Sequence, residues 1–303
     1  MTEPSAAVPP DSNISLDHMG MGSVSAGAYC RLVLMCAAFC AAAVSMALAQ
    51  ERTPAAPNAC RFEVFGSGKV ARVVDGRGFV LDDGREVRLA AIEVPPAPEA
   101  AETGPRAAAG SAAKAMLESI LAGQTVELRG QPEAAATDRY GWLMAHTEVI
   151  GSKAAAGPEM VSRGYARVAA QVGHTACAAE LLSRERAART AKLGLWGEPY
   201  YVVMAAGKGS ELLAERGQFT VVEGKVWSVR ESGGTIYLNF GRRWSEALTV
   251  TILKRHERMF SGAGLGLKRL ENRVVRVRGW IDERNGPRIE ATRPEQIEIA
   301  ELN

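Results

Sequence analysis

The sequence predicts an α+β protein that is mainly β and consists of two small β-barrels in succession. Its 303 residues exceed what one small domain needs, and at about 100–200 residues per domain two domains are expected. After residue 60 the chain contains two sets of five short β-type runs, and a helical stretch follows the third run of each set. With 47% hydrophobic and 23% charged residues, the composition is that of a globular protein. It excludes a disordered, fibrous or polytopic membrane chain.

Residues 1–49 predict an exported protein. Arg31 precedes an apolar run from Leu32 to Leu48, and Ala47-Leu48-Ala49 offers a small-residue cleavage site. This is the pattern of a signal peptide. The run is slightly short for a membrane span, so cleavage near Ala49 is favoured over an uncleaved anchor. We therefore expect a bacterial periplasmic or secreted protein that keeps no membrane span after cleavage.

Cleavage of this leader would leave Cys60 and Cys177 as the cysteines of the mature chain. An even pair in an oxidising compartment favours a disulfide over two buried thiols. The bond would close a loop of more than a hundred residues, for which the chain-entropy model allows up to ~4.7 kcal/mol of stabilisation.

The first predicted barrel follows a linker at residues 50–65 that is rich in Pro, Ala and Asn. The turn Asp82-Asp83-Gly84 indicates a hairpin between the second and third strands. The five predicted strands are Gly68–Val74, Gly78–Leu81, Glu86–Ile92, Thr125–Arg129 and Leu143–Val149.

Helical periodicity predicts three helices in the same region. The apolar residues of Gly104–Ala122 recur at helical spacing, and this stretch separates the third strand from the fourth. Met160–Val168 predicts a short helix followed by an extended piece, and Thr175–Leu193 predicts a long helix that ends at Gly194. Five strands with a helix after the third indicate a closed oligonucleotide/oligosaccharide-binding (OB) barrel.

A second barrel is predicted at residues 217–303, after a connector at 198–216 that is partly helical. Asn285-Gly286 indicates a hairpin turn near its end. Its predicted strands are Phe219–Val229, Thr235–Phe240, Leu248–Leu253, Arg273–Ile281 and Arg288–Ile299, and residues 254–270 lie between the third and the fourth. The pattern again predicts an OB-like barrel.

Several motifs of the first unit occur in the order and spacing of the staphylococcal nuclease-like (thermonuclease) family, over residues 66–197. They are Val73-Val74-Asp75-Gly76, Val87–Pro95, Thr137-Asp138-Arg139-Tyr140-Gly141, Val161-Ser162-Arg163-Gly164-Tyr165-Ala166 and Leu193-Gly194-Leu195-Trp196. Each motif is weak alone, but together they are specific. The resemblance implies a five-stranded OB barrel with three helices, and an ancestral Ca²⁺-dependent phosphodiesterase that cuts DNA and RNA.

Part of the implied catalytic set is present in this sequence. By the resemblance, Asp75 and Glu93 occupy metal-binding positions, and Arg88 is the strand arginine that binds the transition state. Carboxylate oxygens suit a hard cation, and guanidinium groups suit a phosphoryl transition state. Glu93 stands where the family has an aspartate, which is an acid-for-acid change.

The other implied positions are substituted. Arg77 stands where the family has a second aspartate that binds the metal, and Gly78 stands where it has a threonine. Pro96 replaces the glutamate proposed as general base, and Trp142 replaces the second catalytic arginine. We expect no Ca²⁺ cofactor and a disabled mechanism. The alternative is an active Ca²⁺-dependent phosphodiesterase. In that case the match between these positions and the family motif would be shifted by one or more residues.

The exchange at Arg77 leads to a structural hypothesis. Its guanidinium would take the place of the cation and pair with Glu93, and Asp75 could join the pair. The alternative is that Arg77 points to solvent.

The positive charge of the mature chain is concentrated in residues 217–303, which hold 15 basic and 11 acidic residues. Basic residues interleaved with tryptophans around an OB barrel are typical of single-stranded nucleic-acid binding. The candidate residues are Arg242, Arg243, Trp244, Lys254, Arg255, Arg276, Arg278 and Trp280, and the resemblance adds Arg139 and Tyr140. Arginines that alternate along a strand are equally consistent with a solvated face.

Three functions remain open at this point. The favoured one is a non-catalytic module that binds nucleic acid, another polyanion or an envelope protein. The second is the active nuclease, and the third is a structural envelope factor that uses both barrels for protein contacts. Cleavage that requires Ca²⁺ would identify the second, and salt-sensitive binding without cleavage would identify the first.

Overall fold

The computed structural model describes residues 60–99, 103–130, 137–138, 140–170, 172–173 and 175–300. The predicted signal peptide, most of the linker and Arg139 lie outside these residues. Residues 56–303 group into one compact unit, which contains both predicted barrels. Within the described part of the chain, no helix is both long enough and apolar enough to cross a membrane.

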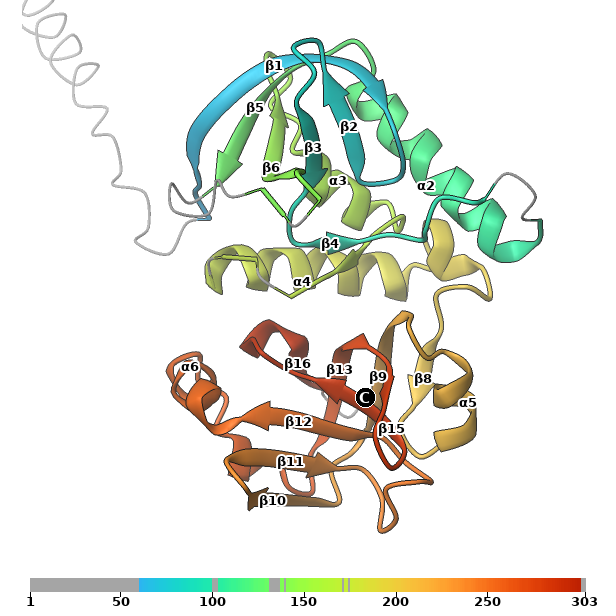
Figure 1. Ribbon diagram of the computed structural model, residues 1–303, viewed down its shortest axis with the longest axis vertical. Helices are drawn as coiled ribbons and strands as arrows, with labels where there is room; N and C mark the ends of the chain where they lie inside the picture. The colour runs from blue at the N-terminus through green and yellow to red at the C-terminus, as the bar shows by residue number, and fades with distance from the viewer. Residues whose placement is uncertain are drawn as a thin grey trace, which may run out of the picture. The chain divides into compact units, whose positions relative to one another are not determined.

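The first barrel is closed, as predicted. Its strands are neighbours in the order β1-β2-β3-β6-β5, and only β3 and β6 run parallel (Figure 1). The bounds are β1 (Glu63–Val73), β2 (Gly78–Leu81), β3 (Glu86–Leu89), β5 (Thr125–Gly130) and β6 (Leu143–Val149). Alternate residues of each strand point inward and form an apolar core that includes Phe79, Leu89 and Leu128.

The third predicted strand is shorter than expected. It ends at Leu89 because Ala91 adopts a left-handed backbone conformation with φ of 66°. The chain continues as a separate short strand, β4 (Ile92–Glu93), which pairs with β7 (Arg167–Val168) and not with the barrel. This break directs Glu93 towards the turn that follows β1.

Helices pack against the barrel and add side chains to its apolar core. Helix α2 (Pro105–Leu121) begins with proline at its first turn, and it buries Ala113, Leu117 and Leu121 at four-residue spacing. Helices α3 (Ala156–Ser162) and α4 (Thr175–Thr190) follow, and the 3₁₀ turn η2 (Gly194–Gly197) comes after them. The three predicted helices are therefore confirmed, but α3 begins four residues before the predicted Met160 and α4 ends three residues before the predicted Leu193.

Two glycines fix how the end of α4 meets the turn after α3. A Cβ on Gly164 would lie 2.1 Å from the carbonyl oxygen of Leu193, and one on Gly194 would lie 2.4 Å from that of Arg163. Both glycines have positive φ, so a side chain at either position would be both strained and blocked.

A disulfide joins Cys60 to Cys177, which confirms the predicted bond. It ties the segment that enters β1 to the first half of α4, across 117 residues of sequence.

The C-terminal region contains the predicted strands, but they form two sheets and not a second closed barrel. One sheet has the order β10-β11-β12-β15-β14 and the other β16-β13-β9-β8. The strands are β8 (Val203–Ala205), β9 (Phe219–Lys225), β10 (Ser228–Ser232), β11 (Thr235–Asn239), β12 (Thr249–Leu253), β13 (Val274–Trp280), β14 (Asp282–Glu283), β15 (Pro287–Glu290) and β16 (Ile297–Ile299). Between them lie α5 (Gly209–Ala214), η3 (Lys254–His256), α6 (Glu257–Gly262), η4 (Leu267–Leu270) and η5 (Pro294–Gln296).

The physical reason for the two sheets is that two predicted long strands are interrupted. The first breaks at Val226-Trp227 into β9 and β10, and the fifth breaks at residues 291–296 into β15 and β16. Each half pairs in a different sheet. The order of partners nevertheless repeats that of the first barrel, including a parallel pair between β12 and β15. The predicted connector also contributes a strand, because β8 pairs in parallel with β9.

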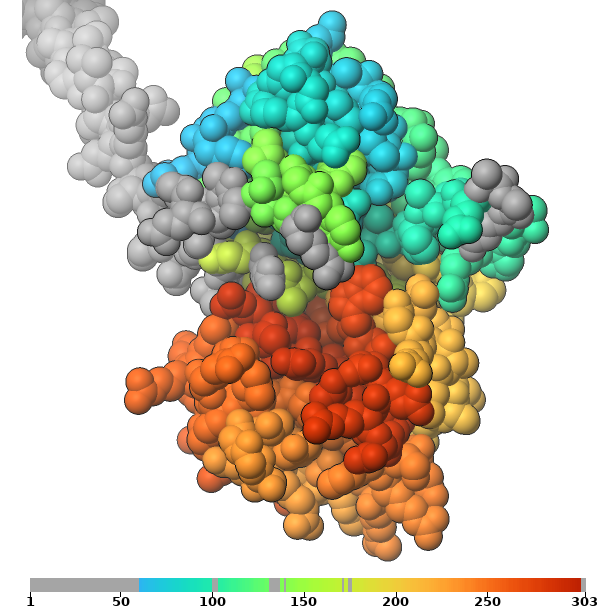
Figure 2. Space-filling view, in the orientation of Figure 1, coloured from blue at the N-terminus to red at the C-terminus, as the bar shows by residue number. Residues whose placement is uncertain are grey.

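The two regions share a buried set of charges. Glu185 of α4 is fully buried, and its Oε2 lies 2.6 Å from Nη1 of Arg278 on β13. Glu185 also accepts hydrogen bonds from Arg189 at 3.0 Å and from the backbone N–H of Val168 at 2.6 Å. Helix α4 therefore lies between the first barrel and the C-terminal sheets (Figure 1), and in the space-filling view the two regions are in contact (Figure 2).

Candidate functional site

The turn after β1 places Arg77 against Glu93. Oδ1 of Asp75 accepts the backbone N–H of Arg77 at 2.8 Å, which closes the turn. Nη1 of Arg77 then lies 2.7 Å from Oε2 of Glu93, and it also donates to the carbonyl oxygen of Ile92 at 3.0 Å. The predicted pair between Arg77 and Glu93 is confirmed.

Asp75 does not join that pair through the Arg77 guanidinium. Its Oδ2 lies 3.7 Å from Nη2 of Arg88, which comes from β3. The four charged side chains therefore form two ion pairs side by side, and they are 14% to 23% exposed. We call Asp75, Arg77, Arg88 and Glu93 the charge cluster.

Trp142 covers the other side of Arg88. The guanidinium carbon of Arg88 lies 4.7 Å from the centroid of the Trp142 ring, a cation–π contact. The same ring occupies the space beside Gly78, where a Cβ would lie 3.1 Å from it and 3.0 Å from Oδ1 of Asp75. The changes at Gly78 and Trp142 are thus sterically coupled, because the ring fills the space that a threonine side chain would need.

Pro96 offers no acid or base to this cluster. It is exposed on the segment after β4, and its carbonyl oxygen lies against Gly110 of α2, where a Cβ would come within 2.1 Å. The site therefore has charged groups that can bind but no group at this position that could accept a proton from water.

The electrostatics of the cluster follow from its burial. Burial raises the pKa of the Glu93 carboxyl, and the nearby guanidinium groups of Arg77 and Arg88 offset this only in part. A negative Glu93 therefore depends on Arg77 as its counter-ion.

The cluster does not fit a calcium ion. Ca²⁺ takes six to eight oxygen ligands, mostly from carboxylates, carbonyls and water. Both carboxylates of the cluster already face guanidinium groups, and Arg77 lies within bonding distance of one of them. In the described ranges, no three or more His, Cys, Asp or Glu side chains are grouped so that they could hold a metal ion.

The structure corrects two of the predicted nucleic-acid-binding residues. Arg278 is fully buried and is held by Glu185 and Glu298, so it cannot reach a nucleic acid. Arg276 is mostly buried and paired with Glu223. Both lie on β13, where Arg278 compensates the buried Glu185 and Glu298 and Arg276 pairs with the partly exposed Glu223, so these arginines do not form a solvated face.

The remaining candidates are exposed but differ in their partners. Lys254 is held between Glu231 and Glu257, at 2.7 and 2.9 Å, and these carboxylates raise its pKa. Arg243 pairs with Glu246 at 2.8 Å. Arg255 lies beside the His256 ring, Tyr140 is 65% exposed and Trp280 is 53% exposed.

Arg242 and Trp244 lie in a different setting, which we call the Trp227–Trp244 surface and define by Trp227, Tyr237, Arg242 and Trp244. The Arg242 guanidinium carbon is 4.8 Å from the Trp227 ring centroid, and the rings of Tyr237 and Trp244 stack at 6.4 Å with planes 6° apart. Trp227 and Trp244 are 50% and 51% exposed. Sequence reasoning missed Trp227 and Tyr237. The sequence offers no signal for Trp227 beyond the residue type, because the strand break at which it lies was not predictable. The signal for Tyr237 is an aromatic residue between apolar residues of an alternating strand.

Comparison with known families identifies the first region. Residues 86–198 match the family described as staphylococcal nuclease homologue. These residues form a staphylococcal nuclease-like domain. The match includes Arg88, Glu93, Pro96 and Trp142, and it begins after Asp75 and Arg77. The C-terminal region lies outside it, so its OB-like character stays a prediction. No curated protein matches the chain.

Proposed function

We propose that the nuclease-like domain is catalytically inactive, and that the protein acts as an exported module that binds single-stranded nucleic acid. The observation that carries the first part is the contact of 2.7 Å between Arg77 and Glu93. It puts a positive side chain beside the carboxylate that the resemblance assigns to the metal.

Charge arithmetic supports the loss of activity. Replacing a ligand carboxylate by a guanidinium changes the local charge by two units. Each unit at 4 Å from a cation is worth ~1 kcal/mol in water, or ~4 kcal/mol at an effective dielectric constant of 20. The replacement of the general base by Pro96 and of the second arginine by Trp142 should lower the rate by further orders of magnitude.

The Trp227–Trp244 surface supports nucleic-acid binding. Exposed aromatic rings bind unpaired bases by stacking, at about 1–3 kcal/mol per base, and stacked arginines add cation–π contributions. Two arginines lie next to this surface. Arg230 pairs with Tyr237 across the β10–β11 ladder, and the carbonyl oxygen of Arg273 accepts the backbone N–H of Val226, the residue before Trp227. In the part of the chain that the structure describes, neither arginine makes an ion pair, so both charges are available to phosphates.

Two observations support export. Residues 31–49 have the pattern of a signal peptide. The Cys60–Cys177 disulfide is of the kind that persists in oxidising compartments such as the bacterial periplasm.

Binding is tested by fluorescence anisotropy of a labelled oligothymidylate with the purified mature protein. We expect an affinity that falls with salt, because phosphate contacts release counterions. Trp244→Ala should weaken binding about 5- to 150-fold, which corresponds to loss of one stacked base. Val202→Ala is the control, since this apolar side chain is 51% exposed and lies outside the Trp227–Trp244 surface. Equal effects of the two substitutions, or no binding at low salt, would contradict the proposed surface.

Inactivation is tested by restoring the substituted positions. Arg77→Asp should bind Ca²⁺ in a calorimetric titration in which the natural protein shows no heat of binding. The triple variant Arg77→Asp, Pro96→Glu, Trp142→Arg should gain cleavage in a non-additive way, because the groups act as one unit. Ca²⁺ binding by the unaltered protein would overturn the proposal.

A further inference from the structure

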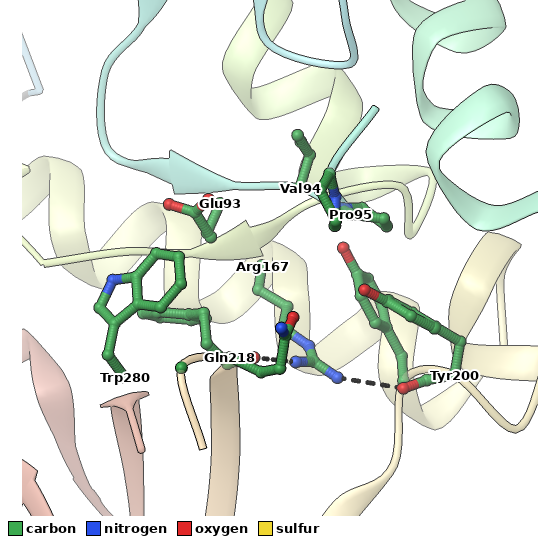
Figure 3. Close-up of a pocket in the computed structure, with 11 residues that line it drawn as sticks. Glu93, Val94, Pro95, Arg167, Tyr200, Gln218 and Trp280 are labelled. Atoms are coloured by element: carbon green, nitrogen blue, oxygen red, sulfur yellow. Dashed lines mark hydrogen bonds between the residues drawn. The ribbon is translucent and has the colours of Figure 1, made fainter. Parts of the chain in front are cut away.

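A cavity lies where the first barrel meets the C-terminal sheets, and the proposed function does not use it. It has a volume of about 180 Å³. On the side of the first barrel it is lined by Glu93, Val94, Pro95 and Pro96 after β4 and by Arg167 of β7; the other side is formed by Tyr200, Tyr201, Gly217, Gln218, Phe219 and Trp280. Figure 3 shows Arg167 in the middle of the cavity, between Trp280 and Tyr200.

Arg167 is a buried cation that forms no ion pair with the residues that the structure describes. Only 6% of the surface of Arg167 is exposed to solvent. Nη1 donates to the carbonyl oxygen of Phe219 at 2.6 Å, and Nη2 reaches that of Tyr200 at 3.5 Å. Nε finds no hydrogen-bond partner among the described residues. Among the residues that the structure describes, no carboxylate lies within 4.0 Å of this guanidinium.

The negative groups near Arg167 are already engaged by other cations. Glu185 attracts the Arg167 guanidinium, but its carboxylate is paired with Arg278 and Arg189. Burial raises the pKa of the Tyr201 phenol, so the ring that stacks on the guanidinium at 4.0 Å stays neutral. Glu93 lines the same cavity, but its carboxylate is engaged by Arg77. Burial also lowers the pKa of Arg167, although an arginine remains protonated at neutral pH. A bound anion would remove this imbalance.

The walls of the cavity favour a flat apolar body. Tyr200, Tyr201, Phe219 and Trp280 present aromatic surface, and Phe219 meets Trp280 edge to face at 6.1 Å. Trp280 is 53% exposed, so one side of its ring is open to a ligand. Gln218 adds a side-chain amide for which the described residues provide no hydrogen-bond partner.

We propose that this cavity binds a small organic anion, in which a carboxylate or phosphate faces Arg167 and a flat ring stacks on Trp280. The site uses one positive group, one amide donor and an aromatic wall, which is the usual composition of a pocket for a small ligand. It is distinct from the charge cluster, which supplies only Glu93, and from the Trp227–Trp244 surface.

The experiment is a calorimetric and tryptophan-fluorescence titration of the mature protein with benzoate, phenyl phosphate, acetate and the neutral isostere benzamide. We expect benzoate or phenyl phosphate to bind with one-to-one stoichiometry, and the stronger of the two identifies the anionic group. Benzamide should bind at least tenfold more weakly because it has no charge, and acetate at least tenfold more weakly because it has no ring.

Variants then locate the site. Trp280→Ala should weaken binding of the aromatic anion at least fivefold, whereas Trp244→Ala, at an equally exposed tryptophan, should leave it unchanged. Arg167→Met should abolish the preference for benzoate over benzamide, and Arg167→Lys should restore part of it. Because Arg167 also supports the fold, circular dichroism must show that both variants are folded, and Gln218→Ala provides a second test outside the core. Equal binding of benzoate and benzamide, equal effects of the two tryptophan variants, or no binding of any probe would overturn the proposal.

Discussion

Arg278 should be among the most stabilising charged side chains of the protein, and Arg278→Met tests this. The residue is fully buried and bonded to Glu185, to Glu298 and to the carbonyl oxygen of Val168. Methionine would keep much of the volume but leave the fully buried Glu185 without its closest counter-ion. Removal of one partner of a buried ion pair costs about 3–5 kcal/mol, and we expect that cost here.

The assay is urea denaturation followed by circular dichroism and by tryptophan fluorescence. Arg186→Met is the matched control, because Arg186 also faces Glu298, at 3.6 Å, but is 61% exposed. An exposed pair of this kind is worth about 0–1 kcal/mol. The double variant Arg278→Met, Glu185→Gln should lose less unfolding free energy than Arg278→Met, because the unpaired buried charge is then absent. With the Glu185→Gln single variant this completes a double-mutant cycle, which measures the coupling energy between Arg278 and Glu185.

This prediction also tests whether the two regions unfold together. Glu185 belongs to α4 and Arg278 to β13, so the loss of Arg278 should lower one common transition. If Arg278→Met and Arg186→Met had the same midpoint, or if only the C-terminal region were destabilised, the role assigned to the buried network would be wrong.

Three further perturbations have defined outcomes. Reduction of the Cys60–Cys177 disulfide, which spans 117 residues, should cost about 2–5 kcal/mol in urea denaturation, and a Cys60→Ser variant should not respond to reductant. Burial lowers the pKa of His146 from 6.5 to about 4, so the unfolded chain binds this proton more tightly than the folded chain does. The free energy of unfolding should therefore fall by about 3 kcal/mol as the pH drops from 6.5 to about 4. His146→Phe should lose this part of the pH dependence. Gly78→Thr should cost about 1–3 kcal/mol by crowding Trp142, and a Trp142→Ala background should reduce that cost; an unchanged cost would show that the ring does not fill this space.

The local elements of the fold could be predicted because their signals are local. Strands such as Gly78–Leu81 and Leu143–Val149 were predicted with the bounds that the structure shows, from alternation and turn residues. Strand breaks were not predictable in the same way. Ala91 and Trp227 carry no glycine or proline signal, and the chain changes sheets there because of the partners it meets in three dimensions.

The charge cluster was predictable in part, because the sequence motifs around its members fix which positions of the family motif they occupy. Arg77 was expected to pair with Glu93, and it does. The pair between Asp75 and Arg88 was not expected, since it depends on how the turn after β1 approaches β3.

Burial of charge was the main error of the sequence-based prediction. Arg276 and Arg278 alternate with valines along β13, which is equally the pattern of a solvated face. Their partners Glu223, Glu185 and Glu298 are 20 to 93 residues away in sequence, so only the tertiary structure brings them together.

The central claim is that the nuclease-like domain no longer cuts nucleic acid because Arg77 stands against Glu93. The most direct measurement is the rate of cleavage of labelled single-stranded DNA by the mature protein, in Ca²⁺ and in chelator. We predict equal background rates in both, with cleavage appearing only in the variant that restores Asp, Glu and Arg at positions 77, 96 and 142. Cleavage by the unaltered protein that chelator abolishes would contradict the claim.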